Sequence, residues 1–199
     1  MHDRDPIAWA IVLGGLRGTP PCIRANPSPS VATDPLNGTS PGNVLVAFSN
    51  YVNCGGSNSQ QTEVWRNTNY GIGSFTRTLN SCANSWVFPR LTSTNIPGWP
   101  AQPFSVYHLH VAAVALPKNG TIIPYECRST DGGATWPTCS ALSAPYNPQP
   151  LGSPWAQCYA GDYQGAAADP AHNRSFFAWA QPLTLPNLPY AIYGNTNDL

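Results

Sequence analysis

Proline and glycine interrupt this chain throughout its length, and their distribution restricts the possible folds more than any other feature. The 199 residues include 22 Pro and 17 Gly, spread along the sequence and not gathered in one linker. A proline inside a helix usually breaks or kinks it, and glycine permits tight turns. The pattern therefore predicts many short strands joined by turns, with no long helices. The length suits one substantial core, and we expect a single domain over residues 1–199.

Charged residues are scarce, and this excludes some classes of partner. They make up 9% of the chain, with nine basic and nine acidic residues. Such a balance gives no strong field for steering toward nucleic acid or an anionic surface. The hydrophobic content of 42% argues against disorder, and no run approaches the roughly 18 apolar residues that span a bilayer. We expect a folded protein without a nucleic-acid partner or a membrane span.

Three segments share one pattern: a strand rich in small residues, a polar turn, then an apolar strand. They cover residues 31–49, 111–125 and 165–180. A third strand follows in each copy and ends at Asn67, Ser129 or Asn195, and these residues lie 62 and 66 positions apart. Four short strands per repeat of this length fit a propeller blade. The small residues suit strands that crowd together at a central hub.

The sequence therefore predicts an all-β fold, a β-propeller of four-stranded antiparallel blades with about three blades present. The approximate blades are 28–82, 104–142 and 160–199. Known propellers close with about four to eight blades, so we expect a fragment of a six-bladed propeller, completed by missing blades. The alternative is that partner chains complete the ring. Ile7–Leu13 is expected to form a strand, with the true start of the protein upstream.

The eight residues from Ser129 to Trp136 have the composition of a tight hairpin turn. Asp131 is placed to accept hydrogen bonds from backbone N–H groups ahead of it. Gly133 and the glycine before it supply positive φ angles. Ser129 and Thr135 are expected to link the two strands, and Trp136 to anchor the turn with a buried ring.

This segment resembles the Asp-box (BNR) repeat of sialidases and related propellers, because it matches Ser-x-Asp-x-Gly-x-Thr-Trp at every fixed position. A degenerate copy occupies residues 67–75, with Asn69 in place of the acid, and Asn195–Asp198 resembles the opening of a third. The resemblance implies a sialidase-like β-propeller in which the motif is a structural turn at a blade's outer edge. Asp131 is therefore expected to form a turn and not to act as a catalytic acid.

Six cysteines beside one methionine suggest an oxidising compartment. Cys127 and Cys139 each lie six positions from Gly133, so we expect a disulfide across the hairpin. Cys54–Cys82 and Cys22–Cys158 are further candidate pairs among the many that six cysteines permit. Glycosylation sequons begin at Asn37, Asn119 and Asn173. Together these features predict a secreted, disulfide-bonded glycoprotein.

Sialidases hydrolyse glycosides with a Tyr nucleophile, and the resemblance implies three arginines, a Tyr/Glu pair and an acid/base Asp. Their Phe-Arg-Ile-Pro signature is absent here; Phe88–Leu91 holds similar letters in another order. The only glutamates, Glu63 and Glu126, flank the expected turns, so we expect them toward the rim. A complete sialidase site cannot be assembled from this segment, and whether the protein is an enzyme stays open.

A candidate pocket comprises Asp162, Tyr163, His108 and His110, which precede expected inner strands where a propeller axis would lie. Asp162 and Tyr163 offer a carboxylate and a phenol to a sugar, or Asp162 only ties down a strand end. His108 and His110 share a strand face; without a third ligand they favour a polar hub lining over a metal site. Trp99, Trp155 and Tyr159 offer rings for sugar stacking. No metal or cofactor is predicted.

Two functions remain in consideration. The first is a secreted, sialidase-like Asp-box propeller that acts on or binds glycans, with a catalytic set that is incomplete in this segment. If it is an enzyme, it is a glycoside hydrolase of the sialidase type. The second is a non-catalytic propeller scaffold that binds proteins or carbohydrates. The absent Phe-Arg-Ile-Pro motif and the scattered arginines favour the second for this segment.

Overall fold

A computed structural model of the chain shows an all-β protein. It describes the nine ranges 29–33, 42–54, 57–81, 85–94, 106–114, 122–146, 164–169, 174–182 and 190–197. These ranges contain antiparallel strands and no helix. The predicted all-β class with four-stranded antiparallel sheets is therefore confirmed. The sheets form an open stack within these ranges and do not close into a ring.

The strands form three sheets, and each sheet takes its strands in chain order. The first sheet contains β1 (Ser30–Thr33), β2 (Val44–Cys54), β3 (Ser57–Asn67) and β4 (Thr76–Asn80). The second contains β5 (Ser85–Thr94), β6 (Val106–Val114), β7 (Ile122–Ser129) and β8 (Thr138–Ala141). The third contains β9 (Gly165–Asp169), β10 (Arg174–Pro182) and β11 (Tyr190–Asn197).

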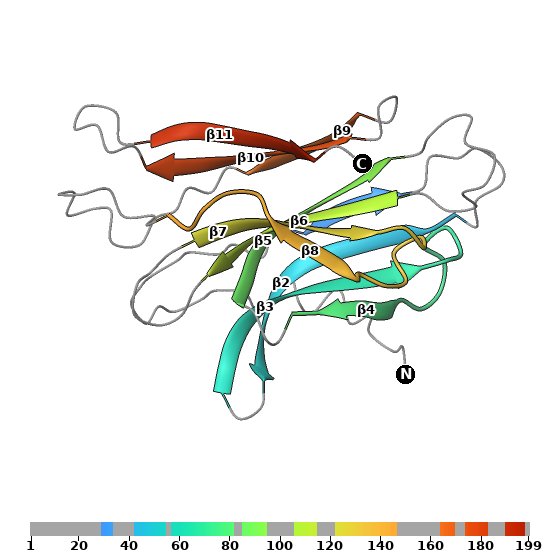
Figure 1. Ribbon diagram of the computed structural model, residues 1–199. Coiled ribbons are helices and arrows are strands. Elements are labelled where there is room, and N and C mark those ends of the chain that lie inside the picture. Colours follow the sequence, from blue (N-terminus) through green and yellow to red (C-terminus); the bar gives the residue numbers. More distant parts are fainter. Residues whose placement is uncertain are drawn as a thin grey trace.

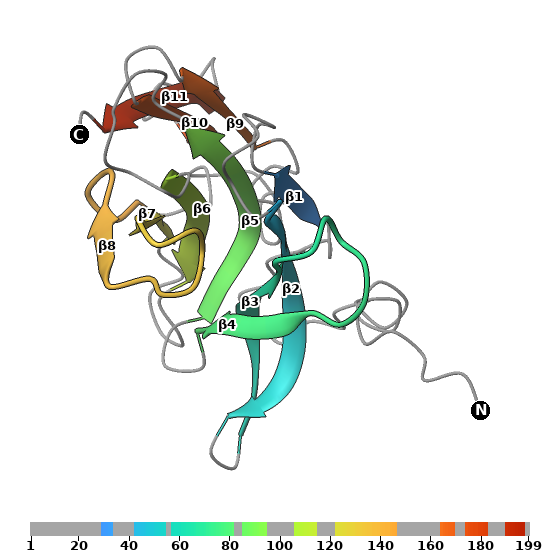
Figure 2. The ribbon, with the colours of Figure 1, turned by 90° about the vertical axis from the view of Figure 1, so that its right-hand side faces the viewer.

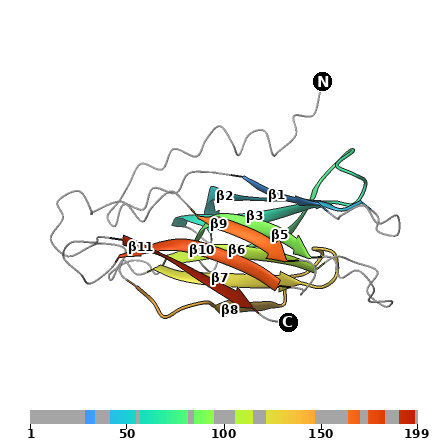
Figure 3. The same ribbon diagram turned by 90° about the horizontal axis from the view of Figure 1, so that it is seen from above.

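The three sheets are layered, with the second sheet between the first and the third (Figure 1). The view from above shows the same order of layers, with β9–β11 lying over β5–β8 (Figure 3). The first strands of successive sheets are neighbours, because β5 contacts both β1 and β9. Figure 2 shows β5 running between them along one side of the stack. The middle sheet therefore has the first sheet on one side and the third sheet on the other.

The interface between the first and second sheets is apolar. Alternate residues of β6 (Tyr107, Leu109 and Val111) are fully buried against side chains of the first sheet. The side chains that they contact in the first sheet are small or aliphatic: Ala32, Leu45, Ala47 and Val64. A period of two along β6 is what a strand needs to present one set of residues to each neighbouring sheet.

The interface between the second and third sheets is mixed. Its apolar part is a cluster of Phe88, Ile122, Tyr146, Phe177 and Trp179. Phe177 and Trp179 on β10 stack with ring centroids 5.6 Å apart. The remaining part is polar and is built from the other face of β6. One interface of the middle sheet is thus a conventional hydrophobic core, and the other combines apolar and polar packing.

A bulge in β5 directs one aromatic ring into this second interface. The β5–β6 register shifts between Val87 and Arg90, so that two residues on β5 oppose one on β6. Phe88 has a positive φ of 55°, and Pro89 occupies the position where no ladder N–H is required. Phe88 is only 3% exposed and packs with Ile122 and Phe177. Pro89 thus lies at a bulge in an edge strand, and both settings tolerate a residue without an N–H.

The strand positions of the second sheet differ from those predicted. Residues 111–117 were expected to form its first strand, but β6 ends at Val114 and is the second strand. The first strand is β5, which lies before the predicted blade range of 104–142. The predicted strands within 31–49 and 165–180 correspond to β1, β2, β9 and β10. Ile7–Leu13 lies outside the described residues.

The turn from Ser129 to Trp136 joins β7 to β8 and is held by its own side chains. Asp131 Oδ1 accepts hydrogen bonds from the backbone N–H groups of Ala134 (3.0 Å) and Thr135 (2.9 Å) and from Ser129 Oγ (2.7 Å). Asp131 Oδ2 accepts from Thr135 Oγ1 at 2.6 Å. Burial opposes ionisation of Asp131, but these hydrogen bonds outweigh it and hold the pKa of the carboxyl below its usual value.

The same turn also touches the first sheet. Gly133 lies against Leu45 on β2, so closely that a Cβ at residue 133 would be 2.3 Å from Leu45 Cδ2. Trp136 Nε1 donates to Thr78 Oγ1 on β4 at 3.3 Å. The disulfide Cys127–Cys139 closes the hairpin behind the turn, between directly paired residues of β7 and β8. This predicted disulfide is confirmed, whereas Cys22, Cys82, Cys158 and the side chain of Cys54 lie outside the described part.

In the turn between β3 and β4, the side chain that accepts the backbone hydrogen bonds is not the one predicted from the sequence. Asn69 was expected in the acid's place, but Asn67 Oδ1 accepts from the N–H groups of Asn69 (2.7 Å) and Gly71 (2.9 Å). Asn67 Nδ2 donates to the carbonyls of Ile72 and Ser74. The amide of Asn67 therefore serves as both donor and acceptor, which a carboxylate cannot do.

We predict that Gly133→Ala destabilises the protein by about 2–4 kcal/mol, because the new Cβ meets Leu45 and the residue has a φ of +83°. The matched control is Gly73→Ala, where φ is +90° but nothing lies within 4 Å of the new Cβ. This control isolates the backbone term and should lose only about 1–2 kcal/mol. Urea denaturation of both variants measures the difference; equal losses would contradict close packing of the turn on β2.

Candidate functional site

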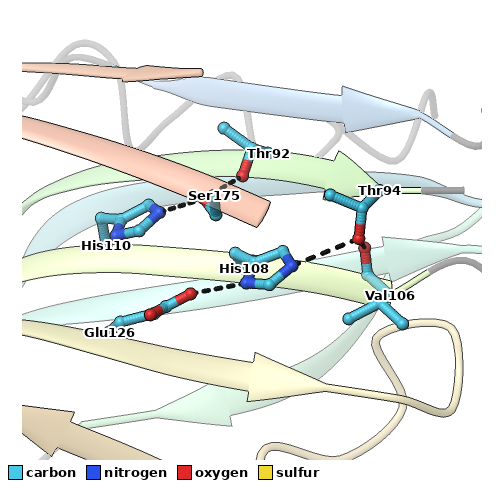
Figure 4. A network of polar contacts seen from close by, with 7 residues as sticks. All are labelled: Thr92, Thr94, Val106, His108, His110, Glu126 and Ser175. Carbon is cyan, nitrogen blue, oxygen red and sulfur yellow. Dashed lines mark hydrogen bonds and ion pairs between the residues drawn. The ribbon is translucent and has the colours of Figure 1, made fainter. Parts of the chain in front are cut away.

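The polar part of the interface between the second and third sheets contains a cluster of imidazole, carboxylate and hydroxyl side chains that contact one another. Six of them meet there, from β5, β6, β7 and β10 (Figure 4). All are at most 8% exposed: Thr92, Thr94, His108, His110, Glu126 and Ser175. The backbone positions them because even-numbered residues of β6 face the third sheet, opposite the apolar odd-numbered set. The site is thus part of a sheet–sheet interface.

One arm of this network runs from β7 through β6 to β5. Glu126 Oε1 lies 2.5 Å from His108 Nδ1, and His108 Nε2 lies 3.3 Å from Thr94 Oγ1. A carboxylate at this distance keeps a proton on Nδ1. The exposed fractions of Thr94, His108 and Glu126 are 0%, 0% and 4%. The arm joins three neighbouring strands of the second sheet by their side chains.

The other arm crosses from the second sheet to the third. His110 Nε2 lies 2.6 Å from Ser175 Oγ on β10, and Ser175 Oγ lies 2.9 Å from Thr92 Oγ1 on β5. The ring of His110 stacks on Phe177 with centroids 4.9 Å apart and planes 11° apart. His110 Nδ1 is buried and has no hydrogen-bond partner among the described residues. His110 is therefore the side chain that couples the polar and apolar parts of the interface.

Burial sets the protonation of His110. Desolvation lowers the pKa of this imidazole to about 4, with Glu126 acting to raise it and His108 to lower it further. At neutral pH the ring is neutral, so Nε2 and the Ser175 hydroxyl form a neutral hydrogen bond. Burial also raises the pKa of the nearby Tyr146 phenol and lowers the pKa values of Arg90 and Arg128.

The order carboxylate, imidazole, hydroxyl in the first arm is the order that hydrolases use to activate a nucleophile. Burial argues against that use here: Thr94 and His108 are both fully buried, so a substrate cannot reach either of them. The Ser175–His110 pair is equally enclosed, at 0% and 1% exposure. In this arrangement the network satisfies buried polar groups and fixes how two sheets meet.

The structure places the predicted site residues in different settings. His108 and His110 share one face of β6, with rings 6.5 Å apart and nearly parallel, but they lie inside the second strand of a sheet and not ahead of an inner strand. Asp162 and Tyr163 lie outside the described residues, as do Trp99, Trp155 and Tyr159. Asn37, Asn119 and Asn173 lie outside them too.

Both glutamates lie on the third strand of a four-stranded sheet, and their side chains are buried. Glu63 is 3% exposed and Glu126 is 4% exposed. Glu63 accepts from Trp65 Nε1 (2.8 Å), Gln61 Nε2 (3.0 Å) and Arg77 Nη1 (3.4 Å) on the first sheet. A position three or four residues before a turn still lies within the strand, and each of these strands runs through a buried part of its sheet.

Sequence reasoning missed Glu126, Ser175, Thr92 and Thr94 as members of the site. Ser175 is separated from His110 by 65 residues and from Thr92 by 83 residues. Pairing of β6 with β7 would have found one of them, since Glu126 is directly opposite His110 in the ladder. The Ser175 contact depends on how two sheets stack, and no local pattern encodes that.

No group of three or more His, Cys, Asp or Glu side chains suited to a metal ion occurs in the described ranges. Those ranges also contain no helix long and apolar enough to cross a membrane. No protein-family model, curated protein or solved structure matches the chain.

We predict that Glu126→Ala destabilises the protein by about 2–4 kcal/mol, because it leaves the buried Nδ1–H of His108 without its acceptor. Glu126→Gln retains an acceptor oxygen in a side chain of nearly the same size, so it should lose less. Chemical denaturation of the two variants beside the unaltered protein measures this ranking. Equal stability of Glu126→Ala and the unaltered protein would contradict the structural role of the His108 contact.

Proposed function

We propose that this chain is part of a secreted, sialidase-like Asp-box β-propeller that binds glycans. The observation that supports this most is the arrangement of the sheets. Three antiparallel sheets follow one another in the chain, each takes its strands in sequential order, and the first strands β1, β5 and β9 are neighbours. Consecutive sheets with neighbouring first strands are what successive propeller blades require.

The turn from Ser129 to Trp136 adds support for the Asp-box proposal. Its fixed Ser, Asp, Gly, Thr and Trp positions each make a contact that depends on residue type, either within the turn or with the first sheet. These contacts account for the motif as structure, without a catalytic role for Asp131. The Cys127–Cys139 disulfide supports the secreted location, since such bonds persist in oxidising compartments.

Binding is favoured over catalysis for the described part of the chain. A sialidase-type site needs arginines that are free to grip a carboxylate. Arg90 on the first strand of the second sheet instead donates Nε to Gln164 O at 2.9 Å and Nη1 to Pro89 O at 2.9 Å. Arg77 contacts Glu63 on the first sheet. The buried histidines and hydroxyls are equally committed to contacts within the interface.

Asp162 and Tyr163 stay the proposed glycan-contacting pair. They lie within three residues of the start of β9, and β9 is the strand of the third sheet that neighbours β5. In a propeller, residues ahead of first strands gather around the axis, where a ligand pocket forms. A carboxylate and a phenol in such a position supply hydrogen bonds to sugar hydroxyls. A protein partner in place of a glycan is the alternative occupant of the same position.

The test is to measure glycan binding and sialoside hydrolysis by the same purified protein. We expect binding on an immobilised glycan array that Asp162→Ala and Tyr163→Phe weaken at least tenfold, and no release of fluorophore from a fluorogenic sialoside. The matched control is Ser143→Ala, an exposed loop change that should leave binding unaltered. Robust turnover that either site variant abolishes would refute the binding proposal and identify a glycoside hydrolase. Binding to no glycan would also refute it.

A further inference from the structure

The two sheet–sheet interfaces can be compared residue by residue, because matching turns define equivalent positions. Asn67 ends β3 and its Oδ1 accepts from the N–H of Gly71 at 2.9 Å. Ser129 ends β7 and its Oγ accepts from the N–H of Gly133 at 2.9 Å. The acceptor therefore lies four residues before the donor in both turns. Asn67 and Ser129 are equivalent on this basis, and the ladders can be counted back from them.

Counting back places three titratable residues where the first interface has three apolar ones. In the first sheet the ladder reads Leu45 opposite Arg66, then Ala47 opposite Val64. In the second sheet it reads His108 opposite Arg128, then His110 opposite Glu126. The apolar trio is Leu45, Ala47 and Val64, each 0% exposed. The titratable trio is His108, His110 and Glu126, each at most 4% exposed.

Both trios face the sheet that follows their own. Leu45, Ala47 and Val64 belong to the core shared with the second sheet. His110 contacts Ser175 and Phe177 of the third sheet, and Figure 4 shows His108 and Glu126 on the same side of the second sheet. Replacing three core hydrophobics with ionisable groups does not strengthen an interface. The substitution does make the interface responsive to protons in the acid range, whereas the apolar trio contains no group that titrates.

We propose that the contact between the second and third sheets is a pH-sensitive interface, which opens in acid at His110 while the contact between the first and second sheets stays closed. The proton acceptor is His110 Nδ1, the buried nitrogen without a partner among the described residues. A proton added there puts a positive charge between the Phe177 ring and the buried hydroxyl of Ser175. Opening the interface lets water solvate that charge.

The direction of the effect follows from the protonation of the closed and open forms. The closed interface holds the pKa of His110 at about 4, compared with about 6.5 for a solvated imidazole. The open form therefore binds more protons between these two values. The closed form has its full stability above pH 6.5 and loses it progressively as the pH falls toward 4. Each pH unit within this window shifts the equilibrium toward opening by about tenfold.

Other charged groups around His110 do not remove this dependence. On β7, Glu126 acts to raise the pKa of His110, but its nearer contact is His108 on β6. His108 on β6 acts to lower the pKa of His110, in the same direction as burial. The cations on the neighbouring strands are Arg90, opposite His110 on β5, and Arg128, opposite His108 on β7. On the third sheet, Arg174 is exposed beside Ser175, and Asp169 on β9 is paired with Arg174 in the ladder. Glu126 is thus the only carboxylate that acts on His110 among the described residues.

Hydrogen–deuterium exchange of the whole chain, followed by mass spectrometry between pH 7.5 and pH 4.5, tests the proposal. Rates are corrected for intrinsic exchange at each pH. We expect protection of amides in β10 and β11 to fall on the order of 50- to 100-fold by pH 4.5. Amides of β2 and β3 serve as the internal reference and should keep their protection. Loss that is uniform across all three sheets, or no loss in the third, would overturn the proposal.

Two variants separate the effect of His110 from general acid instability. His110→Gln keeps a polar side chain within reach of Ser175 but does not titrate, so the acid loss in β10 and β11 should disappear. The second variant copies the first interface: His108→Leu, His110→Ala and Glu126→Val together. It should also keep protection in acid, and it serves if His110→Gln does not fold. A variant that folds and retains the acid loss in the third sheet would refute the role of His110.

Discussion

The whole arrangement depends on one strand of the middle sheet, β6, which is buried on both faces from Val106 to Val111. It presents Tyr107, Leu109 and Val111 to the first sheet and His108 and His110 to the third. Because a strand turns successive side chains to opposite faces, the two interfaces share one backbone. A one-residue shift of β6 would exchange the two sets and put the histidines into the apolar core. The register of this strand therefore fixes both interfaces together.

The two interfaces of the middle sheet differ in the kind of interaction that holds the sheets together. The first relies on non-directional burial of aliphatic and aromatic side chains. The second adds directional hydrogen bonds, such as His110 to Ser175, that are satisfied in only one relative placement of the sheets. A polar interface of this kind is weaker than an apolar one of equal area but more selective in geometry. The first contact thus depends on buried apolar area, and the second depends also on the alignment of its hydrogen-bonding groups.

Local features of this protein were predictable from sequence, and features set by stacking were not. The Cys127–Cys139 disulfide followed from symmetric spacing about Gly133, and the shared face of His108 and His110 from the period of a strand. The strand β5 was missed because Pro89 interrupts it, and the edge position and the bulge that make a proline acceptable there are set by the sheet as a whole. The partner of His110 was missed because Ser175 reaches it through the packing of two sheets.

The hairpin around Ser129–Trp136 has a consequence for the order of folding events. Its hydrogen bonds to Ser129 and Asp131 span at most four residues, and its disulfide spans 12. Closing so short a loop requires little loss of chain entropy, and isolated hairpins form within about 1–10 μs. The contacts of Gly133 with Leu45 and of Trp136 with Thr78 are instead long-range. We therefore expect the hairpin to form before its contacts with the first sheet, because those contacts join residues that are far apart in the chain.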